Sequence, residues 1–415
     1  MGEVMRLVRK YLLAGTGLAA VAASAFPGMA DAAGFAVREQ SVEGQGASFA
    51  GVAAGTNGLS SMFWNPATMT QHNEQGYISE NNITLIAPYS RAKDGTAVGI
   101  GGSPDSGNIS DIGGALASYS VYGLTDDVTI GLATSTPFGL STNADPWVGS
   151  PHGDESSVLT LNVNPNIAYR FNDMLSVAVG LQAEYMKVKL TSDLPTGVEV
   201  FKAKADDIGI GFTAGLLFEP TDSTSIGLGF RSSVSHSLDG DGFRSAPPYD
   251  DDVSAEFDTP ETVTLGIRQR INDDLSLMAG VEWANWSRFK DLTIRDNAGN
   301  PLGSTPEKWK DSWYFSLGAE YAVNEQLMVR GGIAYEDSGV PDSTRTPRIP
   351  DNDRYWLSAG ASYKVADWIT ANVAYSYVFM KDGDVNLPAA VPLPSLNASF
   401  EQHIHIVSVG ATLDW

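Results

Sequence analysis

The side chains in this sequence that could do chemistry are few, and their spacing points to binding rather than catalysis. His403 and His405 are two residues apart, and two imidazoles alone make a poor metal site. Asp250-Asp251-Asp252 could hold a cation, but such a run is typical of a solvated acidic loop. The sequence has no phosphate-binding loop, no nucleophile–histidine–acid spacing and no cysteine. We therefore expect no enzymatic activity, no metal and no cofactor.

A proline and an arginine are the candidates for a binding and transport role. Pro137 lies inside a strand-like segment, residues 127–140, with Gly139 two residues later. Proline cannot donate to a β-ladder, and glycine at this point suggests a bulge or a bend. Arg330 has the parity of Met328 and Gly332, which we expect to face inward. It could bind the carboxylate of a ligand, or it could pair with a neighbouring acid.

The elements that would position these residues are strands with one apolar and one polar face. The chain ends in residues 407–415, where apolar side chains alternate with small or polar ones up to a terminal aromatic. In residues 175–185, Ser176, Gln182 and Glu184 share one face, and the apolar residues share the other. Pairing the last strand with the first would close a barrel and leave no free edge, which hydrocarbon surroundings require.

Short polar turns and long connections alternate along the chain. Six tight turns join twelve strands, and a strand near 76–90 and a terminal strand at 403–415 make 14. The sequence therefore predicts an all-β fold, a 14-stranded antiparallel transmembrane β-barrel over residues 75–415, with the turns periplasmic and the long loops extracellular. A soluble β-sandwich or propeller would need a second packed layer, and no helical pattern provides one. The turns are at 125–127, 172–173, 220–222, 272–274, 324–325 and 366–367, and the long connections at 191–206, 237–254, 295–308, 337–353 and 381–402.

The first 74 residues differ from the rest. Arg6, Arg9 and Lys10, an apolar stretch and an A-x-A site at 30–32 predict a signal peptide over residues 1–32; an uncleaved anchor is the alternative. Residues 33–74 are rich in small residues and contain the apolar pair Phe63-Trp64. We expect this segment to be a hatch that plugs the barrel, although a disordered periplasmic tail is the other possibility.

The overall charge narrows the partners. The net charge is −23, with 26 basic against 49 acidic residues, and phosphates would be repelled. We therefore expect no nucleic acid partner. Aromatic residues near strand ends are expected to form interfacial girdles, namely Trp283, Trp286, Trp313, Tyr314, Trp356 and Trp368.

Several of these residues together resemble the FadL family of outer-membrane transporters of long-chain fatty acids, whose relatives admit aromatic hydrocarbons. The resemblance covers the chain from residue 33 in strand order and is strongest before about residue 190. It implies a bacterial outer-membrane location and a hatch made by the N-terminal residues. The residues that carry it are Ala33-Gly34-Phe35, Glu39, the small-residue run 44–55, Asn65-Pro66-Ala67, residues 134–140, residues 162–173 and residues 185–189.

The resemblance also implies a passive mechanism. A hydrophobic ligand would be captured by extracellular loops and held in a lumenal pocket near Phe35. It would then leave sideways into the membrane through a kink in the third strand, at Thr136-Pro137-Phe138-Gly139-Leu140. Ser192 stands where the best-known member carries a basic lumenal residue, so a neutral hydrocarbon substrate remains open beside long-chain fatty acids.

The partners expected from this resemblance are a hydrophobic small molecule, membrane lipids and lipopolysaccharide, and the outer-membrane barrel assembly machinery, with the protein itself a monomer. Three other functions remain as alternatives: an outer-membrane lipid-modifying enzyme, a general diffusion porin and a structural or adhesive barrel.

Overall fold

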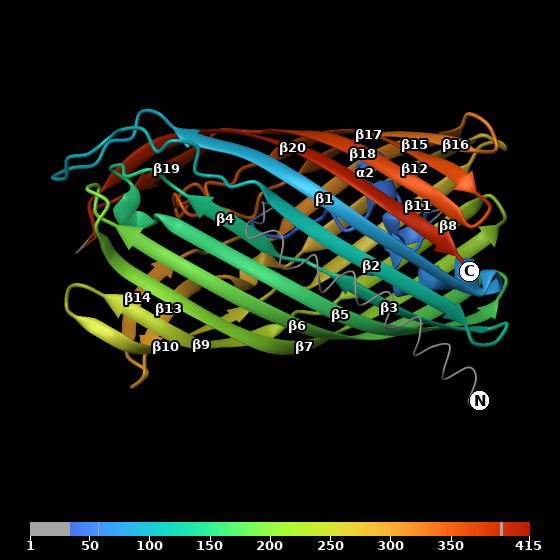
Figure 1. Ribbon diagram of the computed structural model, residues 1–415, viewed down its shortest axis with the longest axis horizontal. Coiled ribbons are helices and arrows are strands. Elements are labelled where there is room, and N and C mark those ends of the chain that lie inside the picture. The colour runs from blue at the N-terminus through green and yellow to red at the C-terminus, as the bar shows by residue number, and fades with distance from the viewer. Residues whose placement is uncertain (1–33, 57, 391–392) are drawn as a thin grey trace.

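The alternating pattern of the sequence forms a closed antiparallel wall in the computed structural model, which describes residues 34–56, 58–390 and 393–415 (Figure 1). The predicted signal peptide and Ala33 lie outside the described residues. The first part of the wall is β1 (Tyr77–Ala92), β2 (Gly113–Gly123), β3 (Val128–Ser135), β4 (Gly139–Asn143), β5 (Glu155–Asn172), β6 (Leu175–Asp193), β7 (Glu199–Thr221), β8 (Thr224–Arg231), β9 (Ser235–Arg244) and β10 (Tyr249–Asp258). The second part is β11 (Thr262–Arg270), β12 (Leu275–Ala284), β13 (Asp291–Asp296), β14 (Pro301–Pro306), β15 (Ser312–Ala322), β16 (Leu327–Glu336), β17 (Arg354–Ala366), β18 (Ile369–Met380), β19 (Gly383–Leu387) and β20 (Leu396–Asp414).

The barrel closes where β1 pairs with β2 on one side and with β20 on the other. It has the predicted 14 strands. Several wall strands are made of two consecutive pieces, which are β3–β4, β8–β9, β10–β11, β12–β13, β14–β15 and β18–β19. The predicted first strand near 76–90 and the terminal strand are therefore confirmed as neighbours, and no sheet edge is left unpaired at the closure.

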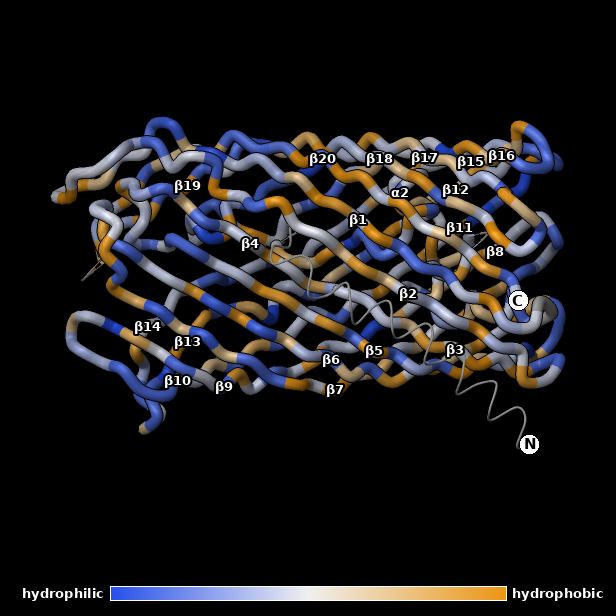
Figure 2. Tube along the Cα trace, viewed as in Figure 1, coloured by the Kyte–Doolittle hydropathy of each residue, from blue (hydrophilic) through white to orange (hydrophobic). Residues whose placement is uncertain are grey.

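The predicted strand faces are confirmed. In β6, Val179 and Leu181 are 59% and 65% exposed, whereas the side chains of Gln182 and Glu184 are buried in the barrel. Figure 2 shows the same alternation of apolar and polar residues along the other strands. Because a shift by one residue would turn Glu184 to the apolar side, the register of this wall is strongly specified.

All six predicted tight turns lie at one end of the barrel, together with the C-terminus (right in Figure 1). Three of them share one device, in which an asparagine side chain accepts from backbone N–H groups two and three residues later: Asn172, Asn272 and Asn324.

The prediction of long loops at the opposite end is partly wrong. Residues 237–254 and 295–308 form the hairpins β9–β10 and β13–β14, because the ladders continue outward beyond the wall (lower left in Figure 1). The connection 337–353 has no strand, and its residue Val340 packs against the aromatic residues around Phe35.

Residues 34–75, here called the lumenal segment, lie inside the barrel as far as the structure describes them, and residues 34–56 and 58–73 are almost entirely buried. They form α2 (Val42–Gly46), η1 (Val52–Ala54), η2 (Ser60–Phe63) and η3 (Pro66–Gln75). Asn65 caps η3 by accepting from the Ala67 N–H, and its amide donates to the carbonyls of Ala53 and Leu216. Asn65 thus joins two turns of the segment to β7, which explains the Asn-Pro-Ala sequence.

The wall makes room for this segment with glycine. A Cβ at Gly227 of β8 would collide with the backbone carbonyl of Ala53, and a Cβ at Gly229 with that of Trp64.

Among residues 34–56, 58–390 and 393–415, no helix has the length and apolar character needed to cross a membrane.

Candidate functional site

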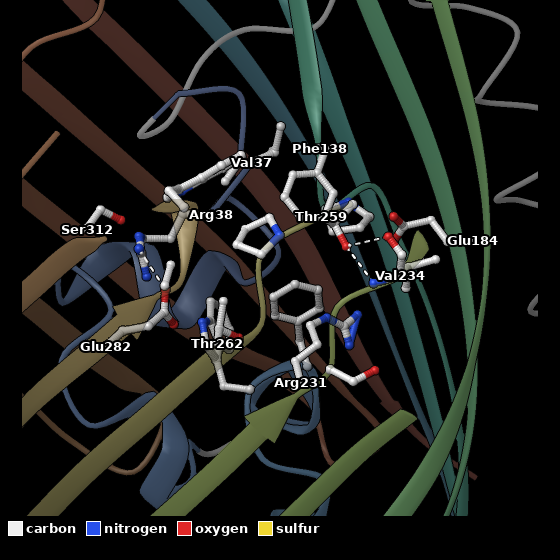
Figure 3. Close-up of a pocket in the computed structure, with 18 of the residues that line it drawn as sticks. Val37, Arg38, Phe138, Glu184, Arg231, Val234, Thr259, Thr262, Glu282 and Ser312 are labelled. Carbon is white, nitrogen blue, oxygen red and sulfur yellow. Dashed lines mark hydrogen bonds and ion pairs between the residues drawn. The ribbon is translucent and has the colours of Figure 1, made fainter. Parts of the chain in front are cut away.

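An inner pocket lies between the lumenal segment and the wall (Figure 3). The lumenal segment contributes one side and the interrupted strand β3–β4 a second, and the rest comes from β6, β8–β9, the chain between β10 and β12, and the ends of β15 and β16. Most of the lining is apolar, with a few charged groups, as is typical of ligand sites. The residues that matter below are Ala36, Val37, Arg38, Phe63, Pro137, Phe138, Glu184, Arg231, Ser232, Val234, Thr259, Pro260, Glu282 and Trp286.

Phe35 is the centre of an aromatic cluster next to this pocket. Its ring is 5% exposed and lies 5.1 Å from the ring of Trp286, centroid to centroid. Four more rings lie within 6.5 Å: Phe138, Phe257, Phe289 and Trp309. Phe35 thus lies beside the inner pocket without lining it, and the rings offer an apolar surface; that a ligand is held next to Phe35 stays a prediction.

The backbone before Phe35 is anchored to the wall and to the connection 337–353. Gly34 has φ +68°, and a Cβ there would collide with Trp309, so glycine is required. The Gly34 N–H donates to Asp351 Oδ2 at 2.9 Å, and Asp351 Oδ1 accepts from Arg354 at 2.6 Å. The start of the lumenal segment is thus fixed by a buried charge pair.

Arg38 is the positive group on the lumenal side of the pocket, and it is already neutralised. Its guanidinium lies 2.9 Å from Glu282 and 3.6 Å from Glu336, and 3.8 Å from the centroid of the Tyr314 ring. Burial lowers the pKa of Arg38, but the two carboxylates outweigh burial and raise the pKa above its ordinary value. Arg38 therefore holds the lumenal segment to β12 and β16.

Arg231, at the end of β8, is the second guanidinium in the pocket, and it lacks a direct acidic partner. It is 8% exposed and lies 4.3 Å above the centroid of the Phe63 ring. Its Nη2 is 3.5 Å from Asn162 Oδ1, whereas its Nη1 has no hydrogen-bond partner. Within the described part of the chain it forms no direct ion pair, but Glu184 and Glu282, which line the same pocket, are near enough to interact with its charge (Figure 3).

A buried acid–histidine–acid row lies beside Arg231. Glu184 accepts from Asn162 at 2.9 Å, and its other oxygen lies 3.5 Å from His236 Nε2. His236 Nδ1 lies 3.2 Å from Asp207. The imidazole is completely buried, and its two nitrogens join β6 to β7.

The wall beside Pro137 is interrupted, at what we call the first seam (residues 111–117 and 135–141). The ladder between β2 and β3 ends at the pair Ser118–Thr134 and resumes as a single bridge at Ser110–Thr142. Between these points the strand turns inward and pairs with the lumenal segment. Val37 N–H donates to Pro137 O, and Gly139 N–H donates to Phe35 O, both at 2.8 Å.

Gln40 completes this attachment. Its amide nitrogen donates to Thr136 O at 2.9 Å, and its amide oxygen accepts from Thr136 N–H at 3.3 Å. The Tyr119 hydroxyl donates to Gln40 O at 2.8 Å. The lumenal segment therefore satisfies the backbone groups that the interrupted ladder releases.

An outer pocket lies farther from the tight turns, between β6, β7, β9, β10 and β13. Its lining is almost wholly apolar and includes Val188, Leu190, Ala203, Leu238, Val253, Leu292 and Ile294. Phe201 and Tyr249 pack against this cluster, whereas Val198, in the turn between β6 and β7, is exposed.

The other predicted site residues lie elsewhere. Glu39 is buried in the lumenal segment, neither carboxylate oxygen has a hydrogen-bond partner, and burial raises its pKa to about 7. Pro66 and Ala67 begin η3. Arg330 faces inward as expected, but it lies 3.3 Å from Glu320 and 3.5 Å from Glu43, outside the inner pocket.

The remaining motifs are not drawn into a site. His403 and His405 lie on the outer face among tyrosine rings, and no group of three or more histidines and acids suited to a metal occurs in the described residues. Residues 250–252 are exposed in β10. Arg231 was missed by sequence reasoning, although continuing the inward parity of Gly227 and Gly229 along β8 would have found it.

Comparison with known proteins places this geometry in context. The family of outer membrane protein transport proteins (OMPP1/FadL/TodX) matches residues 23–415. The long-chain fatty acid transport protein of Escherichia coli O6:H1 is 26% identical over 402 residues, covering 86% of this chain and 90% of that protein. Outer membrane protein P1 of Haemophilus influenzae is 26% identical over 404 residues, covering 85% and 87%.

Solved structures share the fold. A Pseudomonas aeruginosa FadL homologue matches with a TM-score of 0.85 at 23% identity, over 92% of this chain and 100% of that one. The toluene transporter TodX of Pseudomonas putida matches with a TM-score of 0.66 at 17% identity, over 90% and 99%.

Proposed function

The chain belongs to the OMPP1/FadL/TodX family of outer membrane transport proteins, and on that premise we propose that it carries long-chain fatty acids into the outer membrane. Members of this family are transporters and channels rather than enzymes, and this barrel is an outer membrane protein. Relatives named as long-chain fatty acid transport proteins support the choice of substrate class.

The observation that carries this proposal is Arg231, a buried guanidinium whose Nη1 has no hydrogen-bond partner and which lies beside the apolar part of the inner pocket. Its charge interacts with Glu184 and Glu282 without a direct ion pair, and a ligand carboxylate would supply the missing partner of Nη1. Each buried methylene adds roughly 0.8 kcal/mol, and a charge-assisted hydrogen bond about 1.5–3 kcal/mol. An acyl chain with a carboxylate therefore matches both parts of the pocket, and we assign the carboxylate to Arg231 rather than to Arg330.

The proposed route is passive and has three steps. The apolar chain is first captured in the outer pocket and then moves to the inner pocket beside Phe35. The lumenal segment acts as a hatch: its shift breaks the hydrogen bonds that Phe35 and Val37 make with the Pro137 strand. The ligand then leaves through the first seam into the membrane. Apolar surroundings on both sides of this step mean that the chain is never exposed to water.

A second candidate substrate is a neutral aromatic hydrocarbon. The observation that favours it is the cluster of rings around Phe35, which would accept an aromatic guest by edge-to-face contact. The structural neighbour named as a toluene transporter adds to this alternative. In this case Arg231 would not contribute to the affinity for the ligand, because a neutral hydrocarbon has no charge to pair with the guanidinium.

Binding to the purified, delipidated barrel separates the two substrates. Displacement of a fluorescent fatty acid is measured with palmitate, hexadecanol and toluene, on the wild type and on Arg231→Gln. We expect the variant to bind palmitate about 10- to 100-fold more weakly and hexadecanol equally well, because only palmitate has a charge to lose. Arg295→Gln, on the exposed hairpin β13–β14, is the matched control. Binding of toluene alone would establish the second candidate instead.

A further inference from the structure

The ladder of the wall stops at a second place, between β7 and the strand β8–β9. Pairing ends at Thr213–Arg231 and resumes at Asp206–Asp239. No β-ladder therefore joins residues 207–212 to residues 232–238, and we call these two stretches the second seam. Its length is close to that of the first seam, and it also borders the inner pocket.

The strand overlaps β7 from the inside at this point. A Cβ at Gly211 would lie 2.9 Å from Val234 Cγ2 and 2.7 Å from Ser232 Oγ, and a Cβ at Gly209 would collide with Val234. The two glycines of β7 thus leave the space that Val234 fills. The backbone of Val234 is bonded to the opposite neighbour: its N–H donates to Thr259 Oγ1 at 2.9 Å, and its carbonyl accepts from Thr259 N–H at 3.0 Å.

Only a thin closure separates the pocket from the outer face at the second seam. On the inside, Arg231, Ser232 and Val234 line the inner pocket. On the outside, Ile208 and Ile210 are 68% and 76% exposed. Towards β7 the inward segment is bonded at its two ends: Ser232 N–H donates to Phe212 O and Phe212 N–H to Ser232 Oγ, both at 2.9 Å, and Asp207 accepts from Ser237 N–H at 3.1 Å and lies 3.2 Å from His236 Nδ1.

A third interruption, between β10–β11 and β12–β13, is closed by side chains on both faces. Outside, Glu261 pairs with Arg288 at 2.5 Å and accepts from the Asn285 amide at 2.8 Å. Inside, the rings of Phe257 and Phe289 are 5.3 Å apart. The second seam has polar side-chain bonds, from His236 to Asp207 and from the Phe212 N–H to Ser232 Oγ, but beside Val234 it has no ion pair between arginine and glutamate and no pair of rings in contact.

We propose that the second seam is a further binding site and lateral exit for the apolar chain of the ligand, closed by Val234 in this structure. This inference rests on the proposed function. A carboxylate held at Arg231 would place the chain at the end of the seam, next to Val234 and opposite Ile208 and Ile210. Displacement of Val234 would then join the apolar pocket to the apolar outer face, and the chain would stay out of water throughout.

The first test closes each seam separately. Gly211→Cys with Val234→Cys places two thiols within disulfide reach across the second seam, and the chain has no other cysteine. Pro137→Val with Gly139→Val straightens the strand at the first seam. Uptake of radiolabelled palmitate by cells is measured for each pair and for both together, oxidised and reduced, with surface expression and heat-modifiable migration as checks of folding.

With two parallel exits, the straightened variant loses part of its uptake. In that background, oxidation of the 211–234 pair abolishes the remainder, and reduction restores it. Complete loss of uptake on straightening alone, or a residual uptake that oxidation does not change, overturns the second exit. If the wild type neither binds nor takes up palmitate, the proposed function itself fails.

A second measurement uses the wild-type barrel and does not depend on any variant. A fatty acid with a diazirine at its chain end is photoactivated in outer-membrane vesicles, and labelled peptides are mapped by mass spectrometry. Ile208 and Ile210 should be labelled more than Val179 and Leu181, outward residues of the neighbouring strand with similar exposure. Equal labelling overturns the site, because it is what a ligand dissolved in the bilayer would give.

Discussion

The two seams differ in what holds their inward strand. At the first seam, the strand around Pro137 is bonded to the lumenal segment through Phe35, Val37 and Gln40. Both inward strands are also bonded to a threonine of the wall: Phe138 N–H donates to Thr160 Oγ1, and Val234 N–H donates to Thr259 Oγ1, each at 2.9 Å. Both strands leave the ladder for about the same length, but only one of them is attached to an element that is not part of the barrel.

This difference predicts different behaviour. A strand held by a separate segment can change when that segment shifts, so the first seam should respond to ligand and to conditions inside the lumen. A strand held only by residues of the wall moves only when the barrel itself deforms, which is expected to be rarer. The predictions below test this contrast by disturbing one attachment at a time.

Removal of residues 34–75 should have the largest effect. The lumen of a 14-stranded barrel would then be open, so single-channel recordings in planar bilayers should show large steady conductance where the full chain shows little. The first seam would keep Thr160 but lose its bonds to the lumenal segment, whereas the second would keep Thr259. The 211–234 disulfide should therefore form as readily in the shortened chain as in the full one. A failure to form it would show that the second seam also depends on the lumenal segment.

The pH should act on the first seam through Glu39. Burial raises the pKa of this carboxyl from 4.5 to about 7, with Glu336 raising it further against Arg38 and Arg354. Between these pH values the folded state keeps a proton that the unfolded state releases, so stability falls as pH rises, by up to about 3 kcal/mol. Hydrogen exchange of residues 35–40, corrected for intrinsic rates, should speed up from pH 5 to pH 8.

The matched variant is Glu39→Gln, which cannot ionise. It should keep the slow exchange of residues 35–40 at pH 8, while exchange of residues 232–236 should be the same in both proteins. An equal pH response in the variant would place the effect on another group.

The same contrast explains what the sequence could and could not predict. The face of each regular strand follows from period two, so Glu184 inward and Val179 outward were predictable. Pro137 marked the first seam because proline cannot continue a ladder. The second seam has no such residue in β8–β9, and its signals, Gly209 and Gly211, lie on the neighbouring strand. The interruption there depends on tertiary contacts such as the bond from Val234 to Thr259, which a pattern along one strand does not contain.

A break in a strand explains one of the errors with aromatic residues, whereas Tyr314 and Trp356 lie in the regular strands β15 and β17, where alternation with the exposed Trp313 and Tyr355 gives their inward face. Trp313 and Trp368 are exposed on the outside, as girdle residues should be. Trp286, Tyr314 and Trp356 were expected in the same girdles but are buried in the lumen. Trp286 follows the interruption after β12, where parity is lost, so counting along the chain cannot assign its face.

Removing one hydrogen-bonding side chain at each seam should have a smaller effect, which is confined to that seam. Gln40→Met removes the amide that pairs with Thr136, and Thr259→Val removes the hydroxyl that accepts from Val234 N–H. Each change leaves a buried backbone group without a partner, at about 1–3 kcal/mol. Exchange at residues 135–139 should increase only in the first variant, and exchange at 232–236 only in the second. Crossed responses would contradict the separate attachment of the two seams.

The smallest effect is expected at the third interruption, which we take to be structural. Arg288→Gln removes the pair with Glu261, but the guanidinium side chain is 42% exposed, so the loss should be below about 1 kcal/mol. The inner side would still be closed by Phe257 and Phe289. Palmitate uptake and the labelling of Ile208 and Ile210 should therefore be unchanged. The contrary result would be a rise in labelling near Asp258 when the second seam is cross-linked. It would show that the ligand can pass any interruption of this wall, and that attachment to the lumenal segment does not decide where the ligand leaves.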